Sequence, residues 1–133
     1  MTAHSGSCLC GAVKFRINGA FEGFFLCHCS RCRQSSGSAH ASNLFSPDGT
    51  IHWISGRENV KVYHLPDTRF GKSFCSTCGS ALSREKAIGT GLVVPAGCLA
   101  TPVAMKPNAH IFTTSRADWD HDLETVPSFD ERP

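Results

Sequence analysis

Seven of the eight cysteines fall into three short groups, and this clustering restricts what the chain can fold into more than any other feature. The groups are Cys-x-Cys at positions 8 and 10, Cys-x-Cys-x2-Cys at 27, 29 and 32, and Cys-x2-Cys at 75 and 78. Disulfides within these groups would close small, strained rings, whereas a metal ion accepts sulfurs at such spacings readily. We therefore expect metal sites, with disulfides as the alternative.

Other features of the sequence indicate the number of domains and the cellular location of the protein. With 133 residues, the chain has the length of one domain. The amino terminus, MTAHSGSC, has neither the basic nor the apolar segment of a secretory signal, and no window approaches the about 18 apolar residues of a membrane span. We expect a single zinc domain over residues 1–133 that is cytoplasmic, where thiols stay reduced, and has no membrane partner.

Short strand patterns separated by turn residues predict an all-β domain. Ser46-Pro47-Asp48-Gly49 is one such turn, between two apolar runs. No window longer than ten residues keeps a helical period, although SRCRQSSG after the middle cysteine group predicts a helical turn. The expected strands lie at 12–17, 21–27, 38–45, 51–54, 60–65, 72–75, 80–84, 91–95 and 110–114.

The charge balance gives no reason to expect nucleic acid as a partner. The formal charge is +2, but seven thiolates would lower it by seven and two zinc ions would raise it by four, leaving −1. Six of the eleven acidic residues also lie in the last sixteen positions. We interpret this acidic tail, about 118–133, as a solvated surface segment. We expect Arg116, just before it, to pair with one of its acids.

The first and last cysteine groups are each half of a closed metal site. In Cys75-Ser-Thr-Cys78-Gly79 the glycine lets the turn tighten, so that backbone N–H groups point at the thiolates. Cys8-Leu-Cys10 is also followed by a glycine, and on an extended strand its two sulfurs would share a face. Four thiolates would make a structural zinc site, which in small domains contributes on the order of 10 kcal/mol to folding.

The middle group differs because Cys27, Cys29 and Cys32 supply only three thiolates. A zinc ion with three protein ligands keeps a position open for water or substrate, as catalytic sites do. The alternative is a second closed site completed by His28, His40 or Cys98. We expect His28 to be exposed or to orient a ligand, His40 to be an ordinary strand residue, and Cys98 to pack as a small apolar side chain.

Five blocks of the sequence carry a resemblance to a known family. They are GSCLCGAVKF (6–15), CHCSRCRQSSGSAH (27–40), KSFCSTCGSAL (72–82), VPAGCL (94–99) and HIFTTSRADW (110–119). These blocks resemble the glutathione-dependent formaldehyde-activating enzyme family, which includes centromere protein V. The resemblance implies a β-tent fold of stacked antiparallel sheets with two zinc sites. It also implies a structural ion on Cys8, Cys10, Cys75 and Cys78 and a catalytic ion on Cys27, Cys29 and Cys32.

The activity implied by the resemblance is a carbon–sulfur lyase reaction run in reverse, in which glutathione adds to formaldehyde to give S-hydroxymethylglutathione. Glutathione carries two carboxylates that call for cations. Arg31 and Arg33 flank Cys32 and are the candidate anchors, with plain surface arginines as the alternative. Ser35 and Ser36 are candidates to line the same substrate pocket.

Two other functions are compatible with these residues. The same zinc chemistry would serve another thiol or aldehyde, and a non-catalytic zinc-stabilised binding module is the alternative from another class. A chromatin-binding module would need a basic extension, whereas this chain ends in an acidic tail. His110 matches a family position, where it is either an inward-facing strand residue or supports the metal site. The sequence makes no prediction of the oligomeric state.

Overall fold

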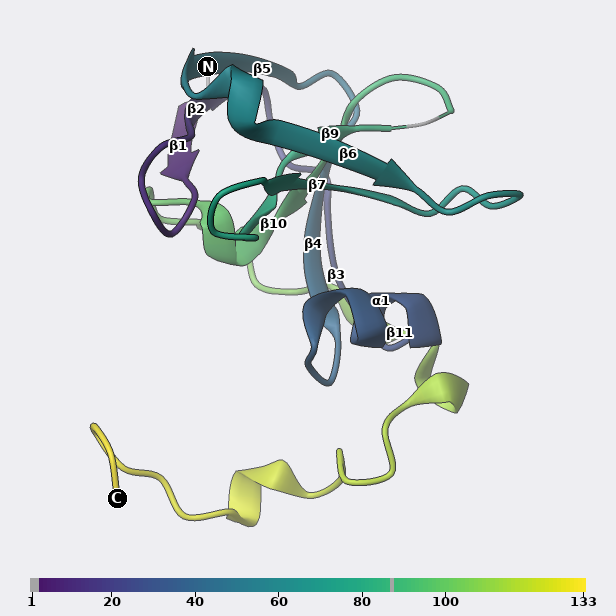
Figure 1. Cartoon of the computed structure of the whole chain (residues 1–133). Coiled ribbons are helices and arrows are strands. Elements are labelled where there is room, and N and C mark those ends of the chain that lie inside the picture. The colour runs from purple at the N-terminus through teal and green to yellow at the C-terminus, as the bar shows by residue number, and fades with distance from the viewer. Residues whose placement is uncertain (1–2, 87) are drawn as a thin grey trace.

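Three small sheets form the body of the protein, as a computed structural model that describes residues 3–86 and 88–133 shows (Figure 1). The first sheet has the order β1-β2-β5 and is antiparallel throughout. The third has the order β6-β7-β8 and is also antiparallel. Their strands are β1 (Ala3–Ser7), β2 (Lys14–Asn18), β5 (Thr50–Ser55), β6 (Val60–His64), β7 (Gly71–Cys75) and β8 (Ala81–Leu82).

The second sheet has more strands than the other two, and the middle cysteine group begins at the end of its strand β3. Its order is β11-β3-β4-β10-β9, and only the pairing of β11 with β3 is parallel. That pairing places Ile111 beside Cys27, so a late segment of the chain borders the cysteine group. The strands are β3 (Gly23–Cys27), β4 (Ala41–Ser46), β9 (Arg84–Glu85), β10 (Leu92–Pro95) and β11 (Ala109–Ile111).

The single α-helix of the described residues, α1 (Ser30–Ser36), follows the end of β3 directly. Its N-cap is Cys29, whose sulfur accepts a hydrogen bond from the Cys32 N–H, and it ends at Gly37, which has φ +66°. The helical turn predicted in SRCRQSSG is therefore confirmed. Four 3-10 turns complete the structure: η1 (Arg57–Asn59), η2 (Ala96–Cys98), η3 (Thr113–Ser115) and η4 (Leu123–Thr125). None of these helices is long and apolar enough to cross a bilayer.

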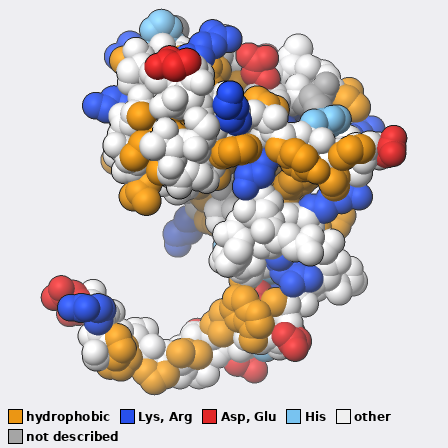
Figure 2. Space-filling view, viewed as in Figure 1, with side chains coloured by type: hydrophobic (Ala, Val, Ile, Leu, Met, Phe, Trp, Pro, Cys, Tyr) orange, Lys and Arg blue, Asp and Glu red, His pale blue; other side chains and the backbone are white. Residues whose placement is uncertain are grey.

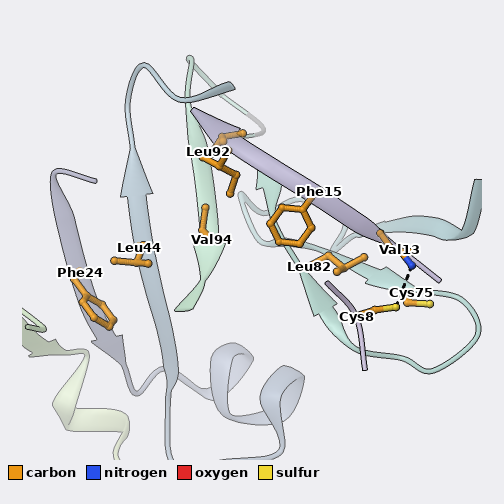
Figure 3. Close-up of a cluster of buried hydrophobic side chains, with 10 residues drawn as sticks. Cys8, Val13, Phe15, Phe24, Leu44, Cys75, Leu82, Leu92 and Val94 are labelled. Atoms are coloured by element: carbon orange, nitrogen blue, oxygen red, sulfur yellow. Dashed lines mark hydrogen bonds between the residues drawn. The ribbon is translucent and has the colours of Figure 1, made fainter. Parts of the chain in front are cut away.

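A single cluster of buried side chains joins the sheets (Figure 3). Alternate residues of β2 point inward, so that Phe15 and Ile17 are fully buried while their neighbours are exposed. Phe15 also meets the edge of Trp53 on β5, with ring centroids 5.8 Å apart. At one end of the cluster lie the sulfurs of Cys8 and Cys75, beside Val13. Cys8 and Cys75 are thus part of the core.

The all-β prediction is confirmed, and the differences lie at strand ends. The strand Ala3–Ser7 was not predicted, because small and polar residues hide the alternation that buries His4 and Gly6. The expected strand 80–84 is divided between two sheets. The expected strand 110–114 ends at Ile111, because Phe112 adopts φ +55° and η3 follows. The β-tent arrangement of the sheets stays a prediction.

Residues 121–133, which we call the C-terminal arm, are all exposed. In Figure 1 this yellow segment leaves the body beside α1 and runs apart from the sheets. The solvated tail that we expected at about 118–133 therefore corresponds to the C-terminal arm.

Replacing Phe15 with alanine should remove the centre of the buried cluster. We expect the free energy of unfolding in urea to fall by about 3–5 kcal/mol, because the cavity left by a phenyl ring is only partly closed by its neighbours. Phe112→Ala is the matched control, since that side chain is 62% exposed, and it should change the value by less than about 0.5 kcal/mol. Equal losses in the two variants would contradict this description of the core.

Candidate metal centres and the adjoining pocket

Four sulfurs from two distant turns meet at the edge of the core. The Sγ atoms of Cys8, Cys10, Cys75 and Cys78 all lie within 4.8 Å of one another. The Cys8–Cys10 and Cys10–Cys75 sulfur separations are 3.5 and 3.9 Å. Tetrahedral Zn–S bonds of about 2.3 Å place sulfurs about 3.8 Å apart, so this donor set fits a zinc ion.

The two turns resemble each other, although the first is not the extended strand that the sequence predicted. Cys8 and Cys10 lie in the turn after β1, closed by a hydrogen bond from the Gly11 N–H to the Cys8 carbonyl oxygen. The second turn is closed by the Gly79 N–H on the Cys75 carbonyl oxygen. Both glycines have positive φ, +82° and +78°, which a side chain would oppose. We expected Cys8 and Cys10 to share one face of an extended strand, as residues i and i+2 do. That expectation was wrong, because the geometry of the turn, and not strand alternation, brings these two sulfurs together.

Ser80 links the two turns, and the sequence analysis missed it. Its Oγ accepts a hydrogen bond from the Leu9 N–H at 2.8 Å and contacts the Cys78 sulfur at 3.2 Å. Hydrogen bonds from the Ser80 hydroxyl and from the backbone N–H groups of Ser80 and Cys10 lower the pKa of Cys78 to about 5. The only sequence signal was a hydroxyl residue directly after the Cys-x2-Cys-Gly turn.

The middle cysteine group gathers three sulfurs where β3 passes into α1. The Sγ atoms of Cys27, Cys29 and Cys32 lie within 4.8 Å of one another. Cys27 and Cys32 are buried, whereas Cys29 is partly exposed. Among residues 3–86 and 88–133, no other histidine, cysteine, aspartate or glutamate joins this group. The set therefore has the donor chemistry of a three-thiolate zinc site.

A cluster of three histidines lies beside these cysteines. We expected His28 to be exposed or to orient a ligand; it is fully buried, so the first of these was wrong and the second stays a prediction. Its Nε2 shares a hydrogen bond with Nδ1 of His110 at 2.8 Å. The ring of His40 packs on that of His28, with centroids 5.1 Å apart. His110 itself is exposed rather than inward-facing, so it joins the cluster from the protein surface.

Asp120 closes the other side of this cluster. One of its carboxylate oxygens lies 3.3 Å from Nδ1 of His28 and 3.4 Å from Nε of Arg116. The side chain of Asp120 is only 12% exposed, so this residue departs from the expectation of a fully solvated acidic tail. The expected pairing of Arg116 with an acid is confirmed. Burial, and next the charge of Arg116, lower the pKa of His28, which favours the neutral ring.

A cavity of about 300 Å³ adjoins the middle cysteine group. It lies between α1, the start of β4, β7 and the turn after β10. Its walls combine a sulfur, hydroxyl groups, backbone and two cations. The polar residues among them are Cys32, Ser35, Ser36, His40, Ser42, Asn43, Lys72, Ser73 and Arg84. Ser35 and Ser36, two of the residues predicted from the sequence, therefore face this pocket.

The cations of the pocket are Lys72 and Arg84, neither of which the sequence analysis singled out. The Lys72 ammonium donates a hydrogen bond to the Ser35 carbonyl oxygen at 3.1 Å. Burial lowers the pKa of Arg84, while the nearby Cys32 sulfur acts in the opposite direction. Neither cation forms an ion pair with a carboxylate of the described residues. The positions of Lys72 and Arg84 in the sequence did not indicate that they lie near the middle cysteine group, because β7 and β9 reach the pocket only through tertiary folding.

Arg31 and Arg33 lie outside the lining of this pocket. Arg31 instead borders a neighbouring groove of about 240 Å³. A larger hollow of about 610 Å³, on the other side of Arg84, contains no cysteine. Cys98 belongs to neither sulfur group; it packs against the core, and burial raises the pKa of its thiol to about 11.

Comparison with known proteins agrees with this arrangement. The sequence pattern that defines the glutathione-dependent formaldehyde-activating enzymes matches residues 3–115, which include all seven clustered cysteines. The chain belongs to this family. A relative from Halomonas elongata, described as a putative glutathione-dependent formaldehyde-activating enzyme, is 30% identical over 121 residues, which are 86% of this chain and 77% of the relative.

A solved structure shares the fold of this family member. A crystal structure of a Rhodobacter sphaeroides protein superposes with a TM-score of 0.57 at 23% sequence identity. The likeness covers 80% of this chain and 98% of the other. At that identity, the comparison supports the fold alone.

Replacing Asp120 with alanine should remove the carboxylate that contacts Nδ1 of His28 and Nε of Arg116. We expect the free energy of unfolding at pH 7 to fall by about 1–3 kcal/mol, because both nitrogens are buried and make no hydrogen bond that could replace this contact. Asp118→Ala is the matched control, because Asp118 is exposed two residues away, and it should change the value by less than about 0.5 kcal/mol. Urea unfolding followed by tryptophan fluorescence measures both. Indistinguishable variants would show that Asp120 does not support His28.

Proposed function

We propose that this protein is a zinc-dependent enzyme of carbon–sulfur lyase type that joins glutathione and formaldehyde to give S-hydroxymethylglutathione. The observation that carries the proposal is a cluster of three sulfurs, one of which, that of Cys32, belongs to the wall of a pocket with two cations that lack carboxylate partners among the described residues. A thiol tripeptide with two carboxylates has the matching chemistry. Family membership supports the same pair of substrates.

The two sulfur groups take different roles in this proposal. Cys8, Cys10, Cys75 and Cys78 would hold a structural zinc ion, since four thiolates complete a tetrahedral site. A zinc ion on Cys27, Cys29 and Cys32 would supply an open coordination position at which a thiol is held as thiolate at neutral pH.

The residues around the pocket would orient the reactants. Lys72 and Arg84 hold the two carboxylates of glutathione, while the hydroxyl group of Ser35 offers a hydrogen bond to its backbone. The Ser36 hydroxyl donates to the Cys32 carbonyl oxygen at 2.7 Å and accepts from the Ser38 N–H, so it supports the wall of the pocket. In the reaction the glutathione sulfur bonds to the formaldehyde carbon, and the carbonyl π bond breaks. The thiol proton ends on the new hydroxyl oxygen. His40 lines the pocket and is the residue we assign to carry that proton.

Replacing Cys29 with serine should remove one metal equivalent and the activity together. We expect elemental analysis to find two zinc ions per wild-type chain and one in Cys29→Ser, because two thiolates and a hydroxyl hold zinc weakly. Exchange NMR with glutathione and formaldehyde should show that formation of S-hydroxymethylglutathione no longer exceeds the uncatalysed rate.

Cys98→Ser is the matched control for this experiment. It removes a thiol that belongs to neither sulfur group, so both zinc ions and the activity should persist. Two zinc ions in the wild type without any response to glutathione and formaldehyde would overturn the proposed substrates. Activity with another thiol or aldehyde would then favour a different reaction at the same site, and its absence a binding module.

Replacing either pocket cation should weaken glutathione binding. We expect Lys72→Met and Arg84→Met each to raise KM for glutathione by about 10- to 100-fold, the value of a charge-assisted hydrogen bond. Lys61→Met and Arg16→Met are the controls, since both side chains are exposed and border neither the pocket nor its neighbours.

An ester of the glycine carboxylate of glutathione sharpens this test. With that substrate, one of the two cation variants should lose its effect, because the carboxylate it bound is no longer charged. Unchanged KM values in both variants, with a raised KM in Arg31→Met, would instead support the anchor predicted from the sequence.

A further inference from the structure

The C-terminal arm presents apolar side chains that lie outside the buried cluster. Leu123, Val126 and Phe129 are 44%, 55% and 62% exposed, and Trp119, just before the arm, is 59% exposed. Figure 2 shows hydrophobic side chains in a row along a segment that stands away from the body. Contiguous apolar surface of this kind marks a site of protein association.

The arm has an ordered beginning that directs it away from its own body. Asp120, held against His28 and Arg116, fixes the chain just before it. Asp122 adopts φ +53°, and the Thr125 hydroxyl donates a hydrogen bond to the Asp122 carbonyl oxygen at 2.8 Å to close η4. These contacts direct the arm away from the sheets of its own chain (Figure 1).

Charge separates the arm from the rest of the protein. Residues 121–133 contain four acids and one arginine, a net charge of −3. Residues 1–120 therefore carry +5, or +2 once seven thiolates and two zinc ions are included. An acidic, apolar segment is electrostatically complementary to the body of another copy of the same chain.

The body offers a groove of matching chemistry. The groove of about 240 Å³ between α1 and the β6–β7 hairpin has apolar and basic side chains in its lining. Tyr63, one of them, is 48% exposed. The groove is lined by Arg31, Gln34, Ser35, Tyr63, Leu65, Phe70 and Lys72. Acids beside Leu123 and Phe129 can meet Arg31 while the apolar side chains cover Tyr63, Leu65 and Phe70.

We propose that the C-terminal arm of one copy docks in the groove between α1 and the β6–β7 hairpin of a second copy. Since every chain carries one arm and one groove, two chains satisfy both in a symmetric dimer. The groove shares Ser35, Phe70 and Lys72 with the pocket beside Cys32. The arm of the partner therefore lies next to that pocket and completes its surroundings.

Light scattering with size-exclusion chromatography tests the dimer. The full chain should be dimeric, and its dissociation constant should rise with salt because charge contributes to docking. Removal of residues 122–133 should give a monomer, and the triple variant Leu123→Ser, Val126→Ser, Phe129→Ser should weaken the dimer at least about tenfold. Ile54→Ser is the matched control, because it removes an apolar side chain that is 51% exposed on β5, and it should stay dimeric.

Mixing two defective chains tests the docking site itself. A chain with Tyr63→Glu keeps its arm and loses its groove, whereas the truncated chain keeps its groove and loses its arm. Each should be monomeric alone, and their mixture should form a heterodimer held by one arm. A monomeric full chain, a dimer unaffected by the loss of the arm, or a mixture that stays monomeric would each overturn the proposal.

Discussion

The convergence of two glycine-closed turns on one point is the constraint on which the rest of the structure depends. Cys10 and Cys75 are 65 residues apart in the chain, yet their sulfurs lie 3.9 Å apart. The turns belong to two different sheets, and Cys8 and Cys75 also belong to the buried cluster. The meeting of the sulfurs therefore sets how the first and third sheets are placed relative to each other. The pocket lies elsewhere, where strands of the second sheet meet α1 and β7.

The two sulfur groups differ in their surroundings. The four-sulfur group is held by its own two turns and by Ser80, and its Cys10 is exposed, whereas a cavity adjoins the three-sulfur group at Cys32. The three-sulfur group lies where β3 meets α1, and one of its thiols also caps the helix. Because that helix ends beside Lys72, the same short segment positions the sulfurs and one wall of the pocket. A substrate held by the pocket cations would thus meet the sulfurs at a fixed distance.

The segment after β11 supports the site from outside. It returns to the cysteines through Asp120, which contacts the buried His28, and then departs as the exposed arm. The carboxylate of Asp120, on an otherwise solvated segment, is thereby in contact with the fully buried ring of His28. The physical link between the core of the site and the protein surface is this short stretch of chain.

The sequence by itself determined the all-β class, the helical turn after the middle group and the division of the cysteines into four and three. Those features depend on local spacing, which residues close in the chain enforce through their own backbone geometry. The strand limits at 80–84 and 110–114 were wrong because sheet partners and the φ of Phe112 decided them. Only the tertiary structure brought Lys72 and Arg84 to the cysteines and buried Asp120 on His28. Contacts between segments far apart in the chain leave no periodic signal, since they arise only when the sheets pack together.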